Sequence, residues 1–235
     1  MKKNTCLTLT LIIVAIIAII ASVLIILPDN DLTPMEPTRI APLYSQIDRS
    51  TVASLDGVTE SATPTDYVLI DVNGYGKMLV RLYPDVAPDT VANFKRLVSE
   101  KFYDGIIFHR VIENFVIQCG DPDGDGISDP NEVTVKGEFS SNGFENNLKH
   151  KRGVLGLARS SAVNSGSSQF YICHSSADNV TALDGKYATF GFVIYGYDVL
   201  DAIATVDTNS SDKPKTDVVI NSIRFVTVPA TGSAN

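Results

Sequence analysis

The sequence contains no tryptophan, and it has only three cysteines and three histidines among its 235 residues. The cysteines, Cys6, Cys119 and Cys173, lack the close spacing of metal-binding pairs and are too few for a disulfide framework. The chain has no Gly-x-Ser-x-Gly elbow and no His-Glu-x-x-His metal pair. These absences argue against a hydrolase that uses a nucleophilic serine or a zinc ion.

The chain is also short of positive charge. It carries 19 Lys and Arg residues against 27 Asp and Glu residues, which gives a formal net charge of -8 and a pI near 4.8. A protein that binds phosphate groups needs a basic face, so no nucleic-acid partner is expected. The length suits one domain of ordinary size together with additional segments.

A long apolar stretch without any charged residue covers residues 7–27. About 20 apolar residues cross the ~30 Å hydrocarbon core of a bilayer as a helix, so we predict a single transmembrane signal-anchor. Lysines precede the stretch and aspartates follow it, which places residues 1–6 in the cytoplasm and the rest of the chain outside. A cleaved signal peptide, which would make the protein secreted, is the alternative. Because Cys6 precedes the stretch, a lipoprotein is excluded.

The remaining chain divides into a linker, a domain and a tail. Residues 28–65 are rich in Pro, Ser, Thr and Asp, and their prolines prevent a lasting helix. We expect them to form a tether between membrane and domain; the alternative is that the apolar patch at residues 40–44 packs on the domain. Residues 66–228 form the predicted domain, and the small polar tail 229–235 is expected to fray.

Within the predicted domain, strand patterns flank two helical ones. Residues 67–72 and 77–82 surround a Gly-rich turn, as in a β-hairpin. Apolar residues recur with helical spacing over residues 86–101, and a shorter helix is expected over residues 197–206. Residues 218–226 have the pattern of a final strand.

The most informative stretch is Phe-His-Arg-Val-Ile-Glu-Asn-Phe-Val-Ile-Gln-Cys-Gly-Asp at residues 108–121. β-Branched and aromatic residues fill both halves, and the Glu-Asn pair between them suits a turn, so we predict two strands. Because alternate side chains of a strand share a face, Val116 and Gln118 should point one way and Cys119 the other.

Three later segments complete a pattern of four ordered motifs. They are Phe-Glu-Asn-Asn-Leu-Lys-His-Lys-Arg-Gly-Val-Leu-Gly-Leu-Ala at residues 144–158, Gly-Ser-Ser-Gln-Phe-Tyr-Ile at 166–172 and Leu-Asp-Gly-Lys-Tyr-Ala-Thr-Phe-Gly at 183–191. Together the motifs resemble those of the cyclophilins, and the resemblance covers residues 67–228. Four ordered motifs are more specific than a single short pattern. The resemblance implies a mainly β fold, a closed eight-stranded antiparallel β-barrel capped by two α-helices.

The same resemblance implies peptidyl-prolyl cis-trans isomerase activity, which requires no cofactor, on proline-containing segments. It aligns Arg110 with the family's catalytic arginine, whose guanidinium donates to the prolyl carbonyl group. Twisting the imide bond returns the lone pair to nitrogen, so a cationic donor binds the twisted bond better than the planar one. The aligned substrate-binding residues are His109, Phe115, Val116, Gln118, Ala158, Arg159, Gln169, Tyr171, Leu183 and Tyr187.

Several positions depart from the family pattern. Cys119 stands where a glycine is usual, Tyr171 replaces the commoner phenylalanine, and Tyr187 replaces a histidine of many eukaryotic members. Ala182 stands where those members carry the tryptophan that helps to hold cyclosporin. We therefore expect weak cyclosporin binding and a closer similarity to prokaryotic cyclophilins. His150 is expected on a loop or a strand edge.

An acidic loop follows the first motif. Its Asp-x-Asp-x-Asp-Gly pattern with a glutamate at the twelfth position has the spacing that surrounds Ca²⁺ with oxygen ligands. A strand precedes it and Pro130 lies within it, so a calcium site here would be a loop without the helices of an EF-hand. An acidic turn that binds no metal is the alternative. The expected ligands are Asp121, Asp123, Asp125, Asp129 and Glu132.

Two functions are compatible with these observations. The first is a membrane-anchored prolyl isomerase that speeds the folding of exported or surface proteins, where slow X-Pro rotation limits the rate. The alternative is a non-catalytic cyclophilin-like module that binds proline-containing segments as a chaperone or assembly factor. The presence of Arg110, Phe115 and Gln118 favours the enzyme.

Overall fold

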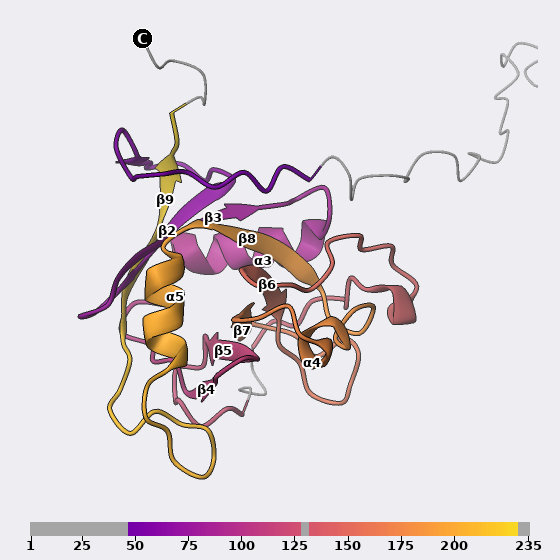
Figure 1. The fold of residues 1–235 in the computed structure, drawn as a ribbon. Coiled ribbons are helices and arrows are strands. Elements are labelled where there is room, and N and C mark those ends of the chain that lie inside the picture. The colour runs from indigo at the N-terminus through magenta and orange to yellow at the C-terminus, as the bar shows by residue number, and fades with distance from the viewer. Residues whose placement is uncertain (1–46, 128–131, 230–235) are drawn as a thin grey trace, which may run out of the picture. The chain divides into compact units, whose positions relative to one another are not determined.

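A computed structural model describes residues 47–127 and 132–229 (Figure 1). In chain order, its elements are β1 (Thr59–Glu60), β2 (Tyr67–Val72), β3 (Gly76–Leu82), α3 (Pro88–Ser99), β4 (Arg110–Ile112), β5 (Val116–Cys119), the 3₁₀ turn η1 (Ser140–Asn142), β6 (Val154–Leu157), β7 (Phe170–Cys173), α4 (Asp178–Thr181), β8 (Thr189–Tyr195), α5 (Tyr197–Ala204) and β9 (Ile220–Thr227). The predicted hairpin, both predicted helices and the predicted final strand are present, with ends that differ by about two residues at most.

The strands form one antiparallel sheet in the order β1-β9-β2-β3-β8-β6-β7-β5-β4. The predicted closed barrel of eight strands is therefore wrong: β1 is a ninth strand, and the order does not return from β4 to β1. Between the segments that precede β4 and β9, the described residues form an isolated bridge at Ile107 and Val219, and no ladder of paired strands. Beyond that bridge the N–H group of Val111 donates to the carbonyl oxygen of Asp212 at 2.7 Å, so a loop instead of a strand meets the edge of β4.

The β2–β3 hairpin follows from its alternating sequence. Val68, Ile70 and Val72 are buried, while the residues between them on β2 stay partly exposed. The chain turns through Gly74 at φ 77° and Gly76 at φ 119°. Glycine adopts such positive φ values without the steric cost that other residues bear.

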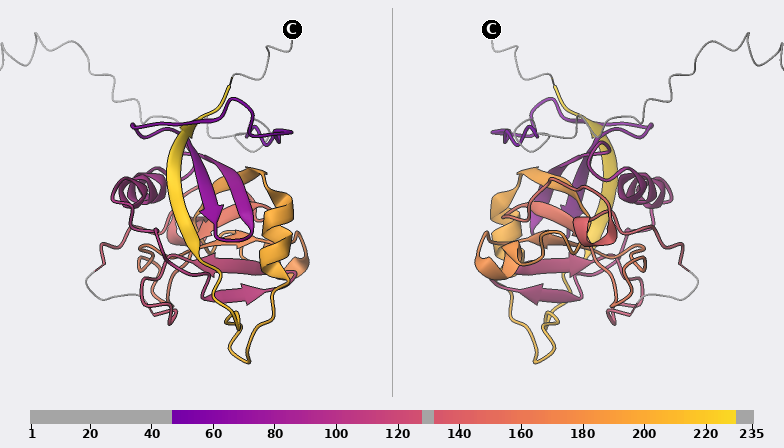
Figure 2. Two further views of the ribbon diagram at one scale, coloured as in Figure 1. Left: turned by 90° about the vertical axis from the view of Figure 1, so that its left-hand side faces the viewer. Right: turned by 90° about the vertical axis from the view of Figure 1, so that its right-hand side faces the viewer.

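Helices α3 and α5 lie on opposite sides of the strands (Figure 2). The apolar face of α3 is buried, and its Phe94 ring meets the Phe170 ring edge to face at 5.4 Å. At the start of α3, the N–H groups of Asp89 and Thr90 donate to the carboxylate of Glu138 at 2.9 and 2.8 Å. An anion at this end satisfies free N–H groups and interacts favourably with the helix dipole.

The sheet separates two apolar clusters. One cluster contains Ile117 and Cys119, and the second contains Val116, Tyr171 and Cys173. The predicted alternation along β5 is thus confirmed. The two cysteines are buried as free thiols on opposite faces.

Part of the predicted tether, residues 47–65, packs against the sheet. The N–H group of Val52 donates to the Ile194 carbonyl oxygen at 3.0 Å, and the Arg81 guanidinium contacts a carboxylate oxygen of Asp48 at 2.7 Å. β1 in this segment pairs with β9. Packing therefore begins before the predicted start of the domain.

The predicted anchor at residues 7–27, the patch at 40–44 and residues 230–235 of the tail lie outside the described residues. Within residues 47–127 and 132–229, no helix has the length and apolar character needed to cross a bilayer.

Candidate active site

Nine of the predicted site residues line one cavity of about 160 Å³. Strands β4, β5 and β7 supply part of the wall, and the segments that follow β6 and α4 supply the rest. The lining residues are Arg110, Phe115, Val116, Gln118, Ala158, Arg159, Tyr171, Leu183 and Tyr187.

Strand register explains why these side chains meet. Arg110 on β4 pairs with Gln118 on β5, and Gln118 pairs in turn with Tyr171 on β7. Directly paired residues of neighbouring strands point to the same face, so a guanidinium, an amide and a phenol lie in one row. The next position in the row is Gly156 on β6, where a Cβ atom would collide with Cζ and Oη of Tyr171. Glycine is thus required there for space.

The Arg110 guanidinium stands at the rim of the cavity. Its side chain is 40% exposed, and Nε lies 3.6 Å from Oδ2 of Asp212. Among the described residues, Asp212 is the ion-pair partner of Arg110. Asp212 was not predicted from the sequence, because nothing in its loop indicates contact with a strand about one hundred residues earlier.

Two glutamines connect the cavity to a neighbouring one. Nε2 of Gln118 donates to Oε1 of Gln169 at 3.0 Å. Both line a second cavity of about 410 Å³, which shares Gln118, Ala158 and Arg159 with the first. The two amide groups therefore lie close to where the two cavities meet.

Arg159 stabilises the wall between these cavities. Its guanidinium lies 4.6 Å from the centre of the Tyr187 ring and 5.1 Å from that of the Phe139 ring. It also donates to the carbonyl oxygen of Lys186 at 2.8 and 3.0 Å. These contacts hold Arg159 against the 183–187 segment, whose Leu183 and Tyr187 face the first cavity.

The Tyr171 hydroxyl group has a buried partner, His150. His150 was expected at a loop or an edge, but it is 2% exposed and its Nε2 lies 2.8 Å from the Tyr171 hydroxyl oxygen. Its Nδ1 lies 2.8 Å from Oδ1 of Asp184. Burial lowers the pKa of His150 and raises that of Tyr171. A tyrosine in the family's phenylalanine position was the signal that could have indicated such a partner.

His109 does not line the cavity, in contrast to its predicted role. Its side chain is buried, and neither ring nitrogen has a hydrogen-bond partner among the described residues. The ring faces Gly126 in the acidic loop. Successive residues of an extended chain point to opposite sides, so His109 turns away from the side that Arg110 occupies. Burial lowers the pKa of His109, and the nearby Asp121 carboxylate opposes this effect.

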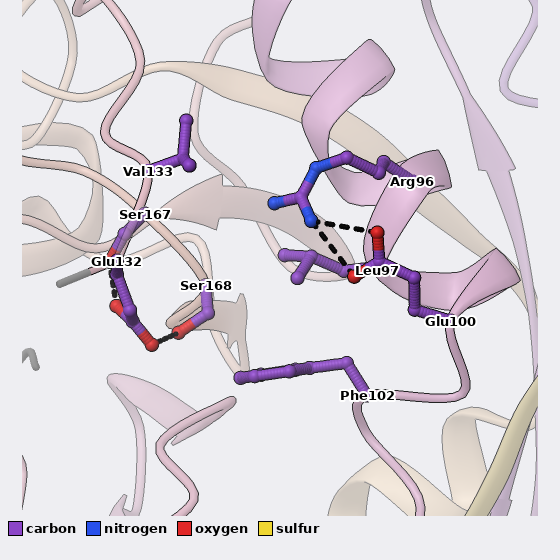
Figure 3. A pocket seen from close by; sticks show the side chains of 8 residues that line it. All are labelled: Arg96, Leu97, Glu100, Phe102, Glu132, Val133, Ser167 and Ser168. Carbon is purple, nitrogen blue, oxygen red and sulfur yellow. Dashed lines mark hydrogen bonds and ion pairs between the residues drawn. The ribbon is translucent and has the colours of Figure 1, made fainter.

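The described carboxylates of the acidic loop accept hydrogen bonds from nearby N–H and hydroxyl groups. The Asp121 carboxylate accepts hydrogen bonds from the N–H groups of Asp123 and Gly126 at 3.2 and 2.6 Å. The Glu132 carboxylate accepts from the hydroxyl groups of Ser167 and Ser168 (Figure 3).

The two remaining expected ligands are Asp125 and Asp129. The Asp125 carboxylate accepts a hydrogen bond from the N–H group of Ile127 at 2.7 Å, and Asp129 lies outside the described residues. No three His, Cys, Asp or Glu side chains in the described part of the chain are grouped to hold a metal ion. In the described residues the carboxylates are thus not grouped as a calcium ion would require, and the calcium site stays a prediction.

Comparisons with known proteins agree with this geometry. The sequence profile described as cyclophilin type peptidyl-prolyl cis-trans isomerase/CLD matches residues 67–225. A peptidyl-prolyl cis-trans isomerase of Acinetobacter baylyi is 35% identical over 181 residues, which are 74% of this chain and 94% of that protein. A Streptococcus pyogenes protein named as a bifunctional phosphatase/peptidyl-prolyl cis-trans isomerase is 38% identical over 175 residues, 63% of this chain, and this chain spans 36% of its length.

A solved structure also resembles the chain. The crystal structure of a Cryptosporidium parvum cyclophilin type peptidyl-prolyl cis-trans isomerase in the presence of the dipeptide Ala-Pro matches with a TM-score of 0.61 and 30% identity, over 69% of this chain and 99% of that one. Fungal and plant isomerases match at 34–40% identity, so the expected closeness to prokaryotic members stays a prediction. The family and activity predicted from the four motifs are confirmed, and the chain belongs to the cyclophilin-type peptidyl-prolyl cis-trans isomerases.

Proposed function

We propose that the domain catalyses X-Pro rotation in the cavity beside Arg110, and that this residue is the catalytic group. The observation that supports the proposal most directly is the convergence of nine aligned residues, eight of them from the four motifs, on a single cavity with a guanidinium at its rim. The Ala-Pro dipeptide present in the crystal structure of the Cryptosporidium relative supports proline-containing segments as ligands.

The cavity offers the interactions that this reaction requires. Amide resonance opposes rotation with a barrier of about 18–20 kcal/mol, and no covalent bond forms or breaks. In the proposed complex, Phe115, Val116 and Leu183 enclose the prolyl ring. The Arg110 guanidinium donates to the prolyl carbonyl oxygen and favours the twisted bond over the planar one.

The size of this effect can be bounded. A charge-assisted hydrogen bond contributes about 1.5–3 kcal/mol, and each tenfold change in rate corresponds to about 1.4 kcal/mol. Arg110 alone would thus account for roughly ten- to hundredfold. Exclusion of water and positioning of the peptide, for which Gln118 and Gln169 are placed, would supply the rest.

An assay of X-Pro isomerisation tests the proposal. Arg110→Ala should lower kcat/KM by roughly ten- to hundredfold while the thermal midpoint stays close to that of the wild type. Arg96→Ala is the matched control, because Arg96 lies on α3 and pairs with Glu100 away from this cavity. An Arg110→Ala protein with full activity would remove this residue from the mechanism. Peptide binding by a wild type without rate enhancement would support the non-catalytic module.

We further propose that residues 7–27 anchor the domain on the outer side of a membrane and that its clients are exported or surface proteins. The uncharged length of this stretch and the lysines before it support the proposal. Carbonate extraction of membranes should leave the full-length chain in the pellet, whereas a chain that begins at residue 28 should be released. Release of the full-length chain, or an N-terminal sequence that begins after residue 27, would contradict the anchor.

A further inference from the structure

Three polar side chains beside the cavity, those of Asp184, His150 and Tyr171, are joined in a row by hydrogen bonds. Nδ1 of His150 lies 2.8 Å from Oδ1 of Asp184, and Nε2 lies 2.8 Å from the hydroxyl oxygen of Tyr171. The backbone N–H group of His150 donates to the same Asp184 oxygen at 2.7 Å. Building on the proposed isomerase function, we propose that His150 and Asp184 are positioning residues, which hold the Tyr171 ring where the prolyl ring packs against it.

The donor and the acceptor of each of these hydrogen bonds can be assigned. An ionised carboxylate accepts hydrogen bonds and donates none, so Nδ1 of His150 carries the ring hydrogen and Nε2 is the acceptor. The Tyr171 hydroxyl group therefore donates to His150. The His150 side chain is 1% exposed and Tyr171 is 4% exposed, so bulk water does not compete for these groups. Asp184 is more accessible, with a side chain 27% exposed.

The three residues connect cavity walls that come from separate parts of the sequence. Tyr171 belongs to β7, and His150 precedes β6. Asp184 lies in the 183–187 segment, between the lining residues Leu183 and Tyr187. One histidine therefore fixes the ring on β7 and the opposite segment relative to each other. Loss of the histidine ring would release the Tyr171 hydroxyl group, whereas the backbone N–H group at position 150 would still donate to Asp184.

Other contacts restrict where a released Tyr171 ring can go. The backbone of Gly156 lies against the Tyr171 ring, and the Tyr187 ring meets it edge to face at 6.0 Å and 84°. A buried hydroxyl group without a partner costs about 1–3 kcal/mol. Without the His150 acceptor, the hydroxyl group should turn toward the water-accessible cavity. The ring would then occupy part of the space that the proline needs.

A double-mutant cycle tests this coupling. His150→Phe removes the acceptor and keeps a ring, and Tyr171→Phe removes the donor. With Tyr171 present, His150→Phe should raise KM about tenfold and change kcat less, because binding space is lost. In the Tyr171→Phe background the same change should alter KM by less than about twofold, because no hydroxyl group then needs a partner. His150→Gln, which offers an amide oxygen, should recover part of the loss.

Equal effects of His150→Phe in both backgrounds would overturn the proposal, as would an unchanged KM in a folded single variant. If His150→Phe does not fold, His150→Gln and Asp184→Leu carry the cycle in the same two backgrounds. Dissociation constants of an Ala-Pro peptide, measured by NMR titration, give a readout that does not depend on turnover. If the dissociation constants show the coupling between His150 and Tyr171 but the wild type has no activity, the isomerase function fails and the positioning role stands. If the wild type is active but the constants show no coupling, the positioning role fails.

Discussion

The carboxylate of Asp212 lies beside the guanidinium of Arg110, with 3.6 Å between Oδ2 and Nε. The backbone carbonyl of Asp212 also accepts from the N–H group of Val111 at 2.7 Å. Asp212 itself has a φ of 61°, a conformation that aspartate and asparagine adopt more readily than most residues. A loop of unusual backbone geometry thus limits the directions that the Arg110 side chain can take.

Replacing Asp212 should affect catalysis more than stability. Asp212→Asn tolerates the same φ but removes the charge, so Arg110 should sample more rotamers and kcat/KM should fall by roughly two- to fivefold. Both side chains are about 40–45% exposed, and such pairs contribute only about 0–1 kcal/mol to stability. Asp207→Asn is the control, because Asp207 pairs with Lys215 at 3.9 Å in a more exposed pair. Equal activities for the two variants would argue against any influence of Asp212 on Arg110.

A side chain at Gly156 should disturb the cavity. The Cβ atom of Gly156→Ala would collide with the Tyr171 ring, so we expect a loss of about 1–3 kcal/mol in the free energy of unfolding and a raised KM. Gly191→Ala is the milder comparison, since its Cβ atom would lie 3.2 Å from the carbonyl oxygen of Arg81. Urea denaturation and steady-state kinetics measure both effects. A KM that rises equally in the two variants would show that the Tyr171 ring is not the sensitive element.

The contrast between these residues shows what the sequence could predict. Motif residues on strands, such as Val116 and Gln118, were placed correctly because alternation along a strand determines the face of each side chain. Asp212 and His150 were missed because their partners, Arg110 and Tyr171, belong to other segments of the sequence. Only the folded structure brings each pair together. His109 was assigned to the site because it aligns with a family histidine, but adjacent residues of an extended chain face opposite ways, and His109 does not line the cavity.

The acidic loop illustrates a second limit. Its spacing of carboxylates matches a calcium loop, but spacing does not determine which donors those carboxylates meet. Asp121 accepts from N–H groups of its own turn, and Glu132 accepts from Ser167 and Ser168, which another loop supplies. A sequence pattern alone does not reveal these hydrogen bonds, because some of the donors come from a distant loop.

The buried ring of His109 should lower the stability of the domain. Both ring nitrogens lack partners among the described residues, and an unpaired buried polar group costs about 1–3 kcal/mol. His109→Leu removes the polar atoms and keeps an apolar side chain, so it should raise the free energy of unfolding by about 1 kcal/mol. Because His109 lies outside the cavity lining, kcat/KM should stay within about twofold of the wild type. A large loss of activity with unchanged stability would restore the predicted role in substrate binding.

The same residue should make stability depend on pH. Burial holds the pKa of His109 below its ordinary value of 6.5, so the unfolded chain binds this proton more readily than the folded protein. As the pH falls through about 6.5, the unfolded state gains protons first and the free energy of unfolding decreases. His109→Leu should reduce this decrease without abolishing it, because the pKa of His150 is also lowered by burial. Urea titrations at about pH 7.5 and about pH 5.5 measure the difference.

Cyclosporin should bind weakly, and a single substitution should strengthen its binding. Ala182 is exposed and adjoins the lining residue Leu183, at the position where the resemblance places a tryptophan that helps to hold the inhibitor. Ala182→Trp would add a large aromatic surface and an N–H donor at the rim. We expect it to lower the inhibition constant by about tenfold or more, while kcat/KM changes by less than about twofold. Because Thr181, the last residue of α4, is also exposed, Thr181→Trp is the matched control. Nanomolar inhibition of the wild type, or equal gains from both tryptophans, would show that other residues of the rim determine inhibitor affinity.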